Sequence, residues 1–178
     1  MNPCPVKLNV VILGVSGQLG SELMKNPLHV LHAYTHDELD LSAISVAELA
    51  GLLDRHQADV VINAAAYTAV DKAEEEIAAA YAINAYAVRK LAQACMLKNV
   101  RIIHVSTDYV FDGKSNVPYE THDTPAPINV YGASKALGES FLFQCQPDAV
   151  CLRTSWLYSR DGNNFVNTML RLMNKSKV

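Results

Sequence analysis

The sequence lacks the features that mark secreted scaffolds, membrane proteins and nucleic-acid-binding proteins. Its four cysteines form no Cys-x-x-Cys pair and have no histidine cluster beside them, which disfavours a disulfide framework and a zinc site. The formal net charge of −3 disfavours a nucleic-acid surface and a polybasic membrane patch. The first apolar run, 10–13, is too short to span a bilayer. We therefore expect a cytoplasmic protein with no metal site, no nucleic-acid partner and no membrane partner.

Short apolar runs alternate with helical patterns along the chain. Strands are predicted over 9–13, 30–34, 60–63, 101–105 and 149–152, and helices over 18–25, 46–56, 72–96, 131–144 and 164–174. The strand runs are β-branched and mostly continuous in apolar character, as strands buried on both faces are. Residues 111–129 contain three prolines and are predicted as an ordered loop over the carboxyl ends of the strands. The alternation predicts an α/β fold, a doubly wound parallel sheet of the Rossmann type, over residues 1–178.

Three glycines, Gly14, Gly17 and Gly20, lie between the first predicted strand and the first predicted helix. In a dinucleotide-binding turn the first glycine permits the tight turn and the second lets the backbone approach a pyrophosphate. The third lets the helix pack closely on the strand, and the first N–H groups of the helix face the phosphates. Such turns also occur by chance, so this one alone is weak evidence for an NADPH or NADH site. Its spacing resembles the extended short-chain dehydrogenase/reductase pattern.

The end of the second predicted strand bears on the choice of cofactor. An acidic residue there would bind the adenosine 2′-hydroxyl, and an arginine would favour a 2′-phosphate. Thr35 and His36 occupy these positions instead, so the pattern leans toward NADPH or use of both cofactors. Asp40 and Leu41 are candidates for contact with the adenine. The alternative is that they cap the helix that follows.

Tyr131 and Lys135 are four residues apart on a predicted helix, so both face the same side. A phenol with a pKa of about 10 is a poor acid–base group at neutral pH, and a close ammonium is expected to lower that pKa. Tyr131 would donate a proton to a ketone oxygen as hydride reaches the carbon, while Lys135 would also bind the nicotinamide ribose. Thr107, at the end of a strand, would offer a hydroxyl to the same oxygen. The alternative is an exposed Tyr–Lys pair, which Thr107 and the glycine turn disfavour.

Two further features lie between these motifs. The segment 63–68 ends the third strand in small residues, which would let a flat cofactor ring approach the backbone. Tight packing beneath a helix explains it equally well. Asn84 is a polar residue on an otherwise apolar helical stripe. Its side chain either braces the active-site strand or satisfies buried backbone groups.

Four segments together resemble the signature of the dTDP-4-dehydrorhamnose reductases: 63–74, 106–113, 129–132 and 153–156. The resemblance implies reduction of the 4-keto group of dTDP-4-dehydro-β-L-rhamnose by NADPH or NADH, giving dTDP-L-rhamnose for cell-surface polysaccharide. It implies Tyr131 as the proton donor, Lys135 as its partner and Thr107 as the tuning hydroxyl. The cofactor contacts that it implies are Gly17, Gln18, Leu19, Ala66, Tyr67, Thr68, Tyr131 and Lys135. The substrate contacts that it implies are Thr107, Asp108 and Trp156, and a core aromatic is the alternative for Trp156.

By this resemblance, family chains continue into a substrate-capping region that is largely absent here. We therefore expect the NAD(P)-binding portion of a longer reductase, with little activity of its own. The resemblance also implies a homodimer, in some members with Mg²⁺ at the subunit contact, although no residue for that metal is indicated.

Two other functions compete with this one. An epimerase or dehydratase of the same superfamily is disfavoured because 107–109 lacks the Asp-Glu pair expected of a dehydratase. A non-catalytic NAD(P)-binding regulatory module, like the β subunit of methionine adenosyltransferase, would share the fold and part of the motifs. The intact Thr107, Tyr131 and Lys135 favour an enzyme.

Overall fold

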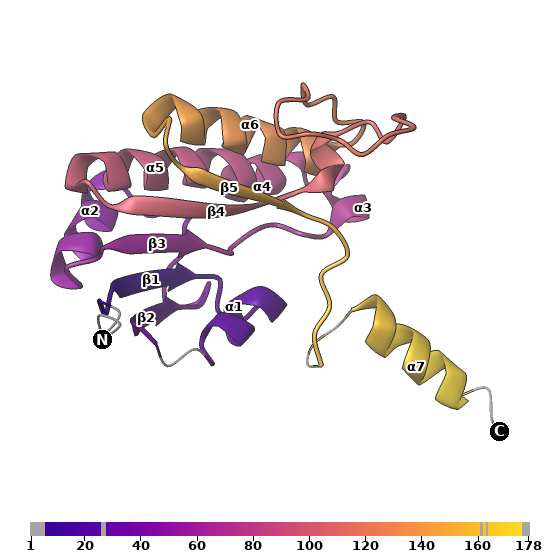
Figure 1. Ribbon diagram of the computed structural model, residues 1–178, viewed down its shortest axis with the longest axis horizontal. Helices are drawn as coiled ribbons and strands as arrows, with labels where there is room; N and C mark the ends of the chain where they lie inside the picture. Colours follow the sequence, from indigo (N-terminus) through magenta and orange to yellow (C-terminus); the bar gives the residue numbers. More distant parts are fainter. Residues whose placement is uncertain (1–5, 26–27, 161, 163, 176–178) are drawn as a thin grey trace, which may run out of the picture.

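The sheet of the computed structural model, which describes residues 6–25, 28–160, 162 and 164–175, has five parallel strands in the order β2-β1-β3-β4-β5 (Figure 1). The strands are β1 (Asn9–Leu13), β2 (Val30–Tyr34), β3 (Val60–Asn63), β4 (Arg101–Thr107) and β5 (Val150–Thr154). The chain leaves β1 toward β2 on one side and returns to β3 on the other. The predicted doubly wound parallel sheet is therefore confirmed. In such sheets, ligands bind at the carboxyl ends of the strands where the order reverses, here between β1 and β3.

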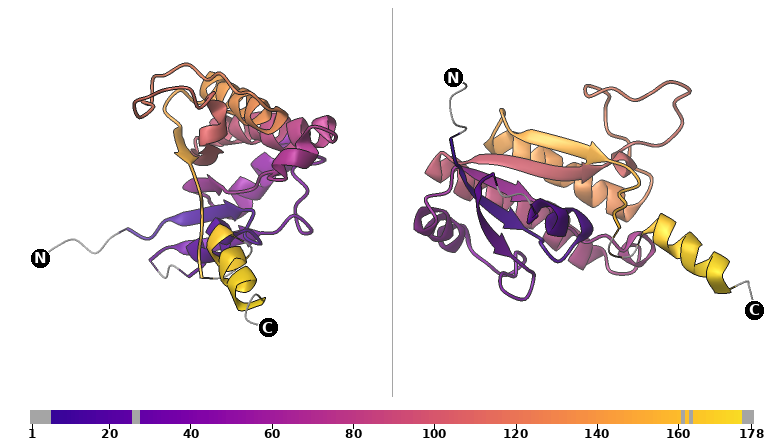
Figure 2. Two further views of the ribbon diagram at one scale, coloured as in Figure 1. Left: turned by 90° about the vertical axis from the view of Figure 1, so that its right-hand side faces the viewer. Right: turned by 60° about the horizontal axis from the view of Figure 1, so that its bottom comes forward.

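Helices cover both faces of the sheet. They are α1 (Gln18–Leu23), α2 (Val46–Arg55), α3 (Val70–Ala73), α4 (Ile77–Tyr81), the π-helical turn η1 (Ala82–Tyr86), α5 (Ala87–Lys98), the 3₁₀ turn η2 (Asp108–Val110), α6 (Val130–Cys145) and α7 (Phe165–Lys175). Helices α2, α5 and α6 pack side by side on one face, and right-handed crossovers place α1 on the other. Helix α7 stands apart from the sheet in Figure 1 and in the right-hand view of Figure 2.

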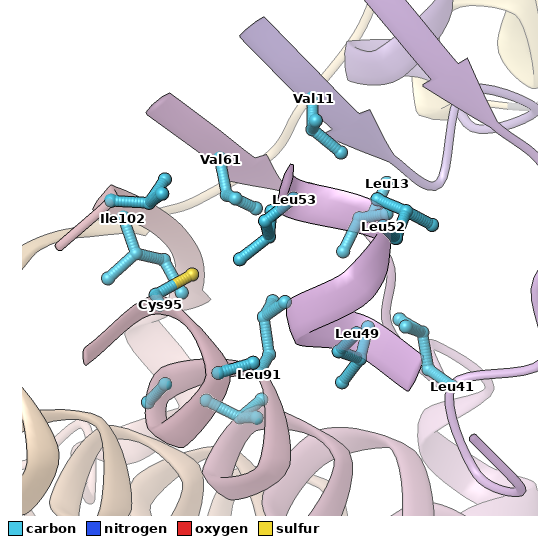
Figure 3. Packing of buried hydrophobic residues seen from close by; sticks show 14 of the residues in the cluster. Val11, Leu13, Leu41, Leu49, Leu52, Leu53, Val61, Leu91, Cys95 and Ile102 are labelled. Carbon is cyan, nitrogen blue, oxygen red and sulfur yellow. The ribbon is translucent and has the colours of Figure 1, made fainter. Parts of the chain in front are cut away.

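The main hydrophobic core fills the space between the sheet and the layer of α2 and α5 (Figure 3). Val11 and Val61 project from the strands toward Leu53 of α2 and Leu91 of α5. All four side chains are almost completely buried. Burying a side chain of this size contributes about 1.5–3 kcal/mol, so these contacts hold β1 and β3 against α2 and α5.

The prediction of one helix over 72–96 is wrong at its start. Helix α3 ends at Ala73, the chain turns through 74–76, and a new helical run begins at Ile77 and continues through η1 into α5. Backbone N–H groups of Glu75 and Glu76 both donate to the carbonyl of Lys72, which closes this turn. The alanine-rich periodicity does not reveal the break, because alanine suits each of the helical segments equally well.

The other predicted elements are confirmed to within a few residues. Strand β4 runs two residues beyond the predicted end and includes Thr107, and β5 runs to Thr154. Residues 111–129 form no helix or strand and lie at the end of the molecule where the strands end (Figure 1). This loop is held by a stack of Phe111 on Tyr119 with ring centroids 4.1 Å apart. A hydrogen bond from the backbone N–H of Ala126 to the carbonyl of Val110 also anchors it, at 2.8 Å.

Within the described ranges, no helix is both long enough and apolar enough to cross a lipid bilayer. In the same residues, Cys95, Cys145 and Cys151 are free thiols, and no cluster of three or more metal-ligating side chains occurs. Cys4 lies outside the described residues.

Candidate active site

The three glycines of the β1–α1 turn have different surroundings. Gly14 has a φ of 83°, and a Cβ there would lie 2.6 Å from the backbone nitrogen of Ala65. A Cβ on Gly20 would lie 2.3 Å from the carbonyl oxygen of Gly14. By contrast, a Cβ on Gly17 would meet only that same oxygen, at 3.4 Å, and Gly17 caps α1 with no side-chain bond to its N–H groups. Gly14 and Gly20 thus allow close packing, whereas the backbone at Gly17 is left open to a ligand.

A cavity of about 340 Å³ lies over the carboxyl ends of β1, β2 and β3. The glycine turn forms one wall, through Gly14 and Gly17, and the end of β2 forms another, through Thr35 and His36. Leu41, which is buried, and Tyr67 also line it. The predicted adenosine end of the site therefore lies beside the glycine turn.

Asp40 is placed differently from both expectations. Its carboxylate accepts hydrogen bonds from the backbone N–H of Ser42 at 2.8 Å and from the Ser42 hydroxyl at 2.7 Å, so it closes a local turn. It does not line the cavity. Nor does it cap α2, because Ser45 is the N-cap and forms a reciprocal capping box with Glu48.

A second cavity, of about 610 Å³, adjoins the first and shares Ser16, Gly17, Ala64, Ala66 and Thr68 with it. Its remaining lining joins segments that are far apart in the sequence: Gln18, Leu19, Gly20 and Ser21 from α1, Val105 and Ser106 from β4, Tyr131 and Lys135 from α6, Thr154 from β5, and Leu157 and Gly162 beyond β5. Apart from Asp40, every residue predicted to contact the cofactor lines one of the two cavities. Cavities of this size are typical of small-molecule and cofactor sites.

The start of α6 is held against the end of β4, which brings Tyr131 to Thr107. The side chain of Asn129 caps the helix by accepting from the backbone N–H of Gly132 at 2.7 Å. A Cβ on Gly132 would lie 2.1 Å from the carbonyl oxygen of Tyr109, so only glycine allows this approach. The ring of Tyr109 meets the edge of Tyr131 with centroids 5.6 Å apart.

Burial raises the pKa of Tyr131 above its ordinary value, while hydrogen bonding with Thr107 acts in the opposite direction. The predicted lowering by Lys135 is therefore wrong for this structure, since Lys135 is not among the causes. The two residues share a helix face, but their side chains diverge. The ammonium of Lys135 donates to the carbonyl of Val105 in β4 at 2.7 Å and lies 3.3 Å from His104 Nε2.

Lys135 is completely enclosed, and burial lowers its pKa to about 8. His104 is also buried, and burial together with Lys135 holds its pKa well below the ordinary value, so the imidazole is neutral. Asn63 Oδ1 accepts from the backbone N–H of Ala65, which turns the Asn63 amide nitrogen toward His104 Nδ1 at 3.1 Å.

The predicted site residues do not include the ion pair between Arg153 and Glu139, in which the glutamate is buried and the arginine is partly buried. Arg153 of β5 donates to both carboxylate oxygens of Glu139, at 2.7 to 3.2 Å, and Ser106 donates to the same carboxylate at 2.5 Å. The guanidinium also lies 4.9 Å from the ring centroid of Phe111, which ties the loop to the sheet. Position 139 could have been found from the sequence, because it lies one helical turn after Lys135 on the same face.

Asn84 takes both of the roles considered for it. Its Oδ1 accepts from the backbone N–H of Tyr67 at 2.9 Å, and its Nδ2 donates to the Tyr67 carbonyl at 3.0 Å and to the Ser134 hydroxyl at 3.0 Å. The residue lies in η1, and π-helical turns of this kind are frequent at functional sites. Asn84 thus satisfies a buried peptide and joins segment 64–68 to α6.

The three predicted substrate contacts lie at or just beyond the carboxyl ends of β4 and β5. Asp108 accepts from the Thr107 hydroxyl at 3.2 Å and from the Ser155 hydroxyl at 2.7 Å. Trp156 has 72% of its surface exposed, a φ of 54° and an edge contact with Phe165. Among the described residues, Trp156 is therefore not part of a hydrophobic core.

A parallel sheet with a glycine turn after β1, a threonine at the end of β4 and a Tyr-x-x-x-Lys pair opening α6 defines a protein of the short-chain dehydrogenase/reductase class. Within that class, the model of the family described as RmlD substrate binding domain matches residues 8–178. The chain belongs to this family, which confirms the resemblance seen in its motifs.

Named relatives point the same way. The chain is 44% identical over 167 residues to a dTDP-4-dehydrorhamnose reductase of Aggregatibacter actinomycetemcomitans, covering 92% of this chain and 56% of that one. It is 42% identical to the protein of that name from Burkholderia thailandensis, covering 93% of this chain and 55% of that one. The crystal structure of dTDP-4-dehydrorhamnose reductase from Bacillus anthracis in complex with NADP superposes with a TM-score of 0.90 at 39% identity, covering 96% of this chain and 61% of that one. The chain thus spans about half the length of the curated relatives that it matches.

Proposed function

We propose that this chain is the cofactor-binding part of an NAD(P)H-dependent reductase that converts dTDP-4-dehydro-β-L-rhamnose to dTDP-L-rhamnose. The observation that carries the proposal is the pair of adjoining cavities. They are lined by the glycine turn, segment 64–68 and the Tyr131–Lys135 pair, and they share a wall at the carboxyl ends of the strands. The family membership and the names of the relatives support the same reaction.

The lining residues fit a nicotinamide dinucleotide. A Cβ is excluded at Gly14 and Gly20 but not at Gly17, which leaves an approachable backbone where a pyrophosphate would bind. In this proposal, Thr35 and Leu41 contact the adenosine half, and Lys135 binds the nicotinamide ribose. The bound cofactor supplies the hydride for the reduction.

Tyr131 donates the proton that the ketone oxygen needs. Its raised pKa keeps the phenol protonated at neutral pH, as an acid must be, and the neighbouring Thr107 orients the same oxygen. In this proposal, Asp108 and the exposed Trp156, which follow β4 and β5, contact the nucleotide sugar.

The cofactor site can be tested with one added methyl group. Gly17→Ala inserts a Cβ that meets protein only at 3.4 Å, so the fold should tolerate it, while the methyl group enters the space of the pyrophosphate. We expect NADPH and NADH titrations, followed by fluorescence, to lose saturable binding in this variant. Gly51→Ala on α2 is the matched control, because a Cβ there meets nothing within 4 Å and should leave binding intact.

Two results would contradict the proposal. One is a folded wild-type chain that binds neither dinucleotide. The other is Gly17→Ala binding as tightly as Gly51→Ala. Binding without any reduction of dTDP-4-dehydrorhamnose, in a protein that has the full length of the relatives, would favour the non-catalytic regulatory module instead.

A further inference from the structure

The carboxylate of Glu38 occupies hydrogen-bond donors at the carboxyl end of β2. The backbone N–H and the hydroxyl of Thr35 both donate to Glu38 Oε2, each at 2.9 Å. Thr35, His36 and Leu39 line the cavity of about 340 Å³, whereas Glu38 does not, so its carboxylate reaches the cavity wall only through its hydrogen bonds with Thr35. In folds of this type, the group at the end of the second strand meets the 2′ position of the adenosine ribose.

Helix capping does not explain this contact. Ser45 and Glu48 form the same arrangement, with the Ser45 N–H and hydroxyl donating to Glu48 Oε2 at 2.9 and 2.6 Å, and that box opens the ten-residue helix α2. The Thr35 box is followed only by a turn over 36–38, closed by a hydrogen bond from Leu39 N–H to the Thr35 carbonyl at 3.1 Å. The motif therefore opens a helix at Ser45, whereas at Thr35 it closes a short turn beside the cavity.

The charges around this end of the cavity are mostly negative. Residues 35–44 contain Asp37, Glu38 and Asp40, no lysine or arginine, and His36 as the one basic side chain. The ammonium of Lys90 approaches from α5, but it donates to the carbonyls of Ser42 and Ile44 at 2.9 and 2.7 Å. Among the residues that line the cavity there is no arginine or lysine to bind a phosphate.

We propose that Glu38 is a specificity-determining residue that makes this chain bind NADH more tightly than NADPH. Its carboxylate takes the two Thr35 donors that a 2′-phosphate would otherwise use, and it repels that phosphate. The 2′-hydroxyl of NADH can instead donate a hydrogen bond to the carboxylate. Hydrogen bonds from Thr35 lower the pKa of Glu38, so the group is charged at neutral pH. The inference rests on the proposed cofactor site.

This inference reverses the preference expected from the sequence. That expectation rested on the residues directly after β2, where Thr35 occupies a position at which an acidic residue would favour NADH. The structure brings an acid back to this position from three residues further along the chain. The NADP of the Bacillus anthracis structure is a property of that protein, which is 39% identical to this one.

The test compares dissociation constants of NADH and NADPH for the wild-type chain, Glu38→Gln and Glu48→Gln, measured by fluorescence or calorimetry at low, fixed ionic strength. Glu38→Gln keeps the shape and an acceptor for Thr35 but removes the charge. Because interactions between exposed charges are weak, we expect the ratio of the two constants to move toward NADPH by about three- to tenfold. Glu48→Gln, in the matched box, should keep the wild-type ratio, and the effect of Glu38→Gln should shrink as salt is added.

His36→Arg provides an independent arm, because a guanidinium at the same rim should also favour NADPH. The role of Glu38 would be overturned if His36→Arg changed the ratio of the NADH and NADPH dissociation constants and Glu38→Gln left that ratio unchanged. Tighter binding of NADPH than NADH by the wild-type chain would overturn it as well. A folded chain that binds neither dinucleotide would overturn the proposed function along with the inference, so the two failures are distinguishable.

Discussion

Lys135 should make the stability of the fold depend on pH in a particular direction. Burial lowers its pKa from the ordinary 10.5 to about 8, so between these values the unfolded chain binds a proton that the folded chain does not. The free energy of unfolding therefore rises with pH over this window. The cost of the buried ammonium is fully present below pH 8 and is absent above 10.5, where the amine is neutral in both states.

The size of this effect follows from the interval between the two pKa values. At about 1.4 kcal/mol for each tenfold change in proton affinity, the contribution is about 3 kcal/mol. Other groups oppose it: burial raises the pKa of Cys95 and of Cys151 to about 12, so these thiols favour unfolding as the pH rises above their ordinary value of 9.0. A difference between two variants is needed to isolate the lysine.

The variant is Lys135→Met, which keeps the length of the side chain and removes the amine. We expect wild-type stability to rise relative to Lys135→Met by up to about 3 kcal/mol between pH 8 and 10.5. At high pH the wild-type amine is neutral, so the wild-type protein no longer carries the cost of a buried charge. The variant should then be the less stable protein, because it lacks the hydrogen bond to the Val105 carbonyl. Urea unfolding followed by circular dichroism, with linear extrapolation at each pH, measures the difference.

Lys98→Met is the control for this experiment. Lys98 pairs with Asp54 at the surface of α5, so its loss should leave the wild-type pH dependence in place. A wild-type and a Lys135→Met protein whose stabilities differ by the same amount at every pH would refute the burial argument.

Two further predictions concern chemistry and bracing. In a protein with the full length of the relatives, Tyr131→Phe should lower turnover of dTDP-4-dehydrorhamnose by about 10²–10⁴-fold and change cofactor affinity little, because only the proton donor is lost; a wild-type rate would exclude Tyr131 as the acid. Asn84→Leu removes the buried hydrogen-bond partner of the Tyr67 peptide and of Ser134. The free energy of unfolding should therefore fall by about 2–4 kcal/mol, and NADH should bind more weakly. Gln93→Leu, on the same helical run, is the comparison, and equal losses in both variants would contradict the bracing role.

Local pattern in the sequence was sufficient for the sheet and for part of the site. Strands β1, β2 and β3 have the predicted bounds, because short apolar β-branched runs between turn residues need no distant partner to be recognised. The glycine spacing and the four-residue separation of Tyr131 and Lys135 are equally local. These patterns indicate a site at a strand-to-helix turn and at the start of a helix, and they depend on no tertiary contact.

Tertiary structure decided what the side chains do there. Lys135 reaches the Val105 carbonyl rather than the Tyr131 phenol, because the close approach of α6 to β4 buries it. Glu38 returns to Thr35 through a turn, and Glu139 meets Arg153 across α6 and β5. Burial and hydrogen-bond partners arise between residues far apart in the chain, and they set the pKa values. Periodicity records only which face of an element is apolar, so the sequence could place these groups without showing their partners.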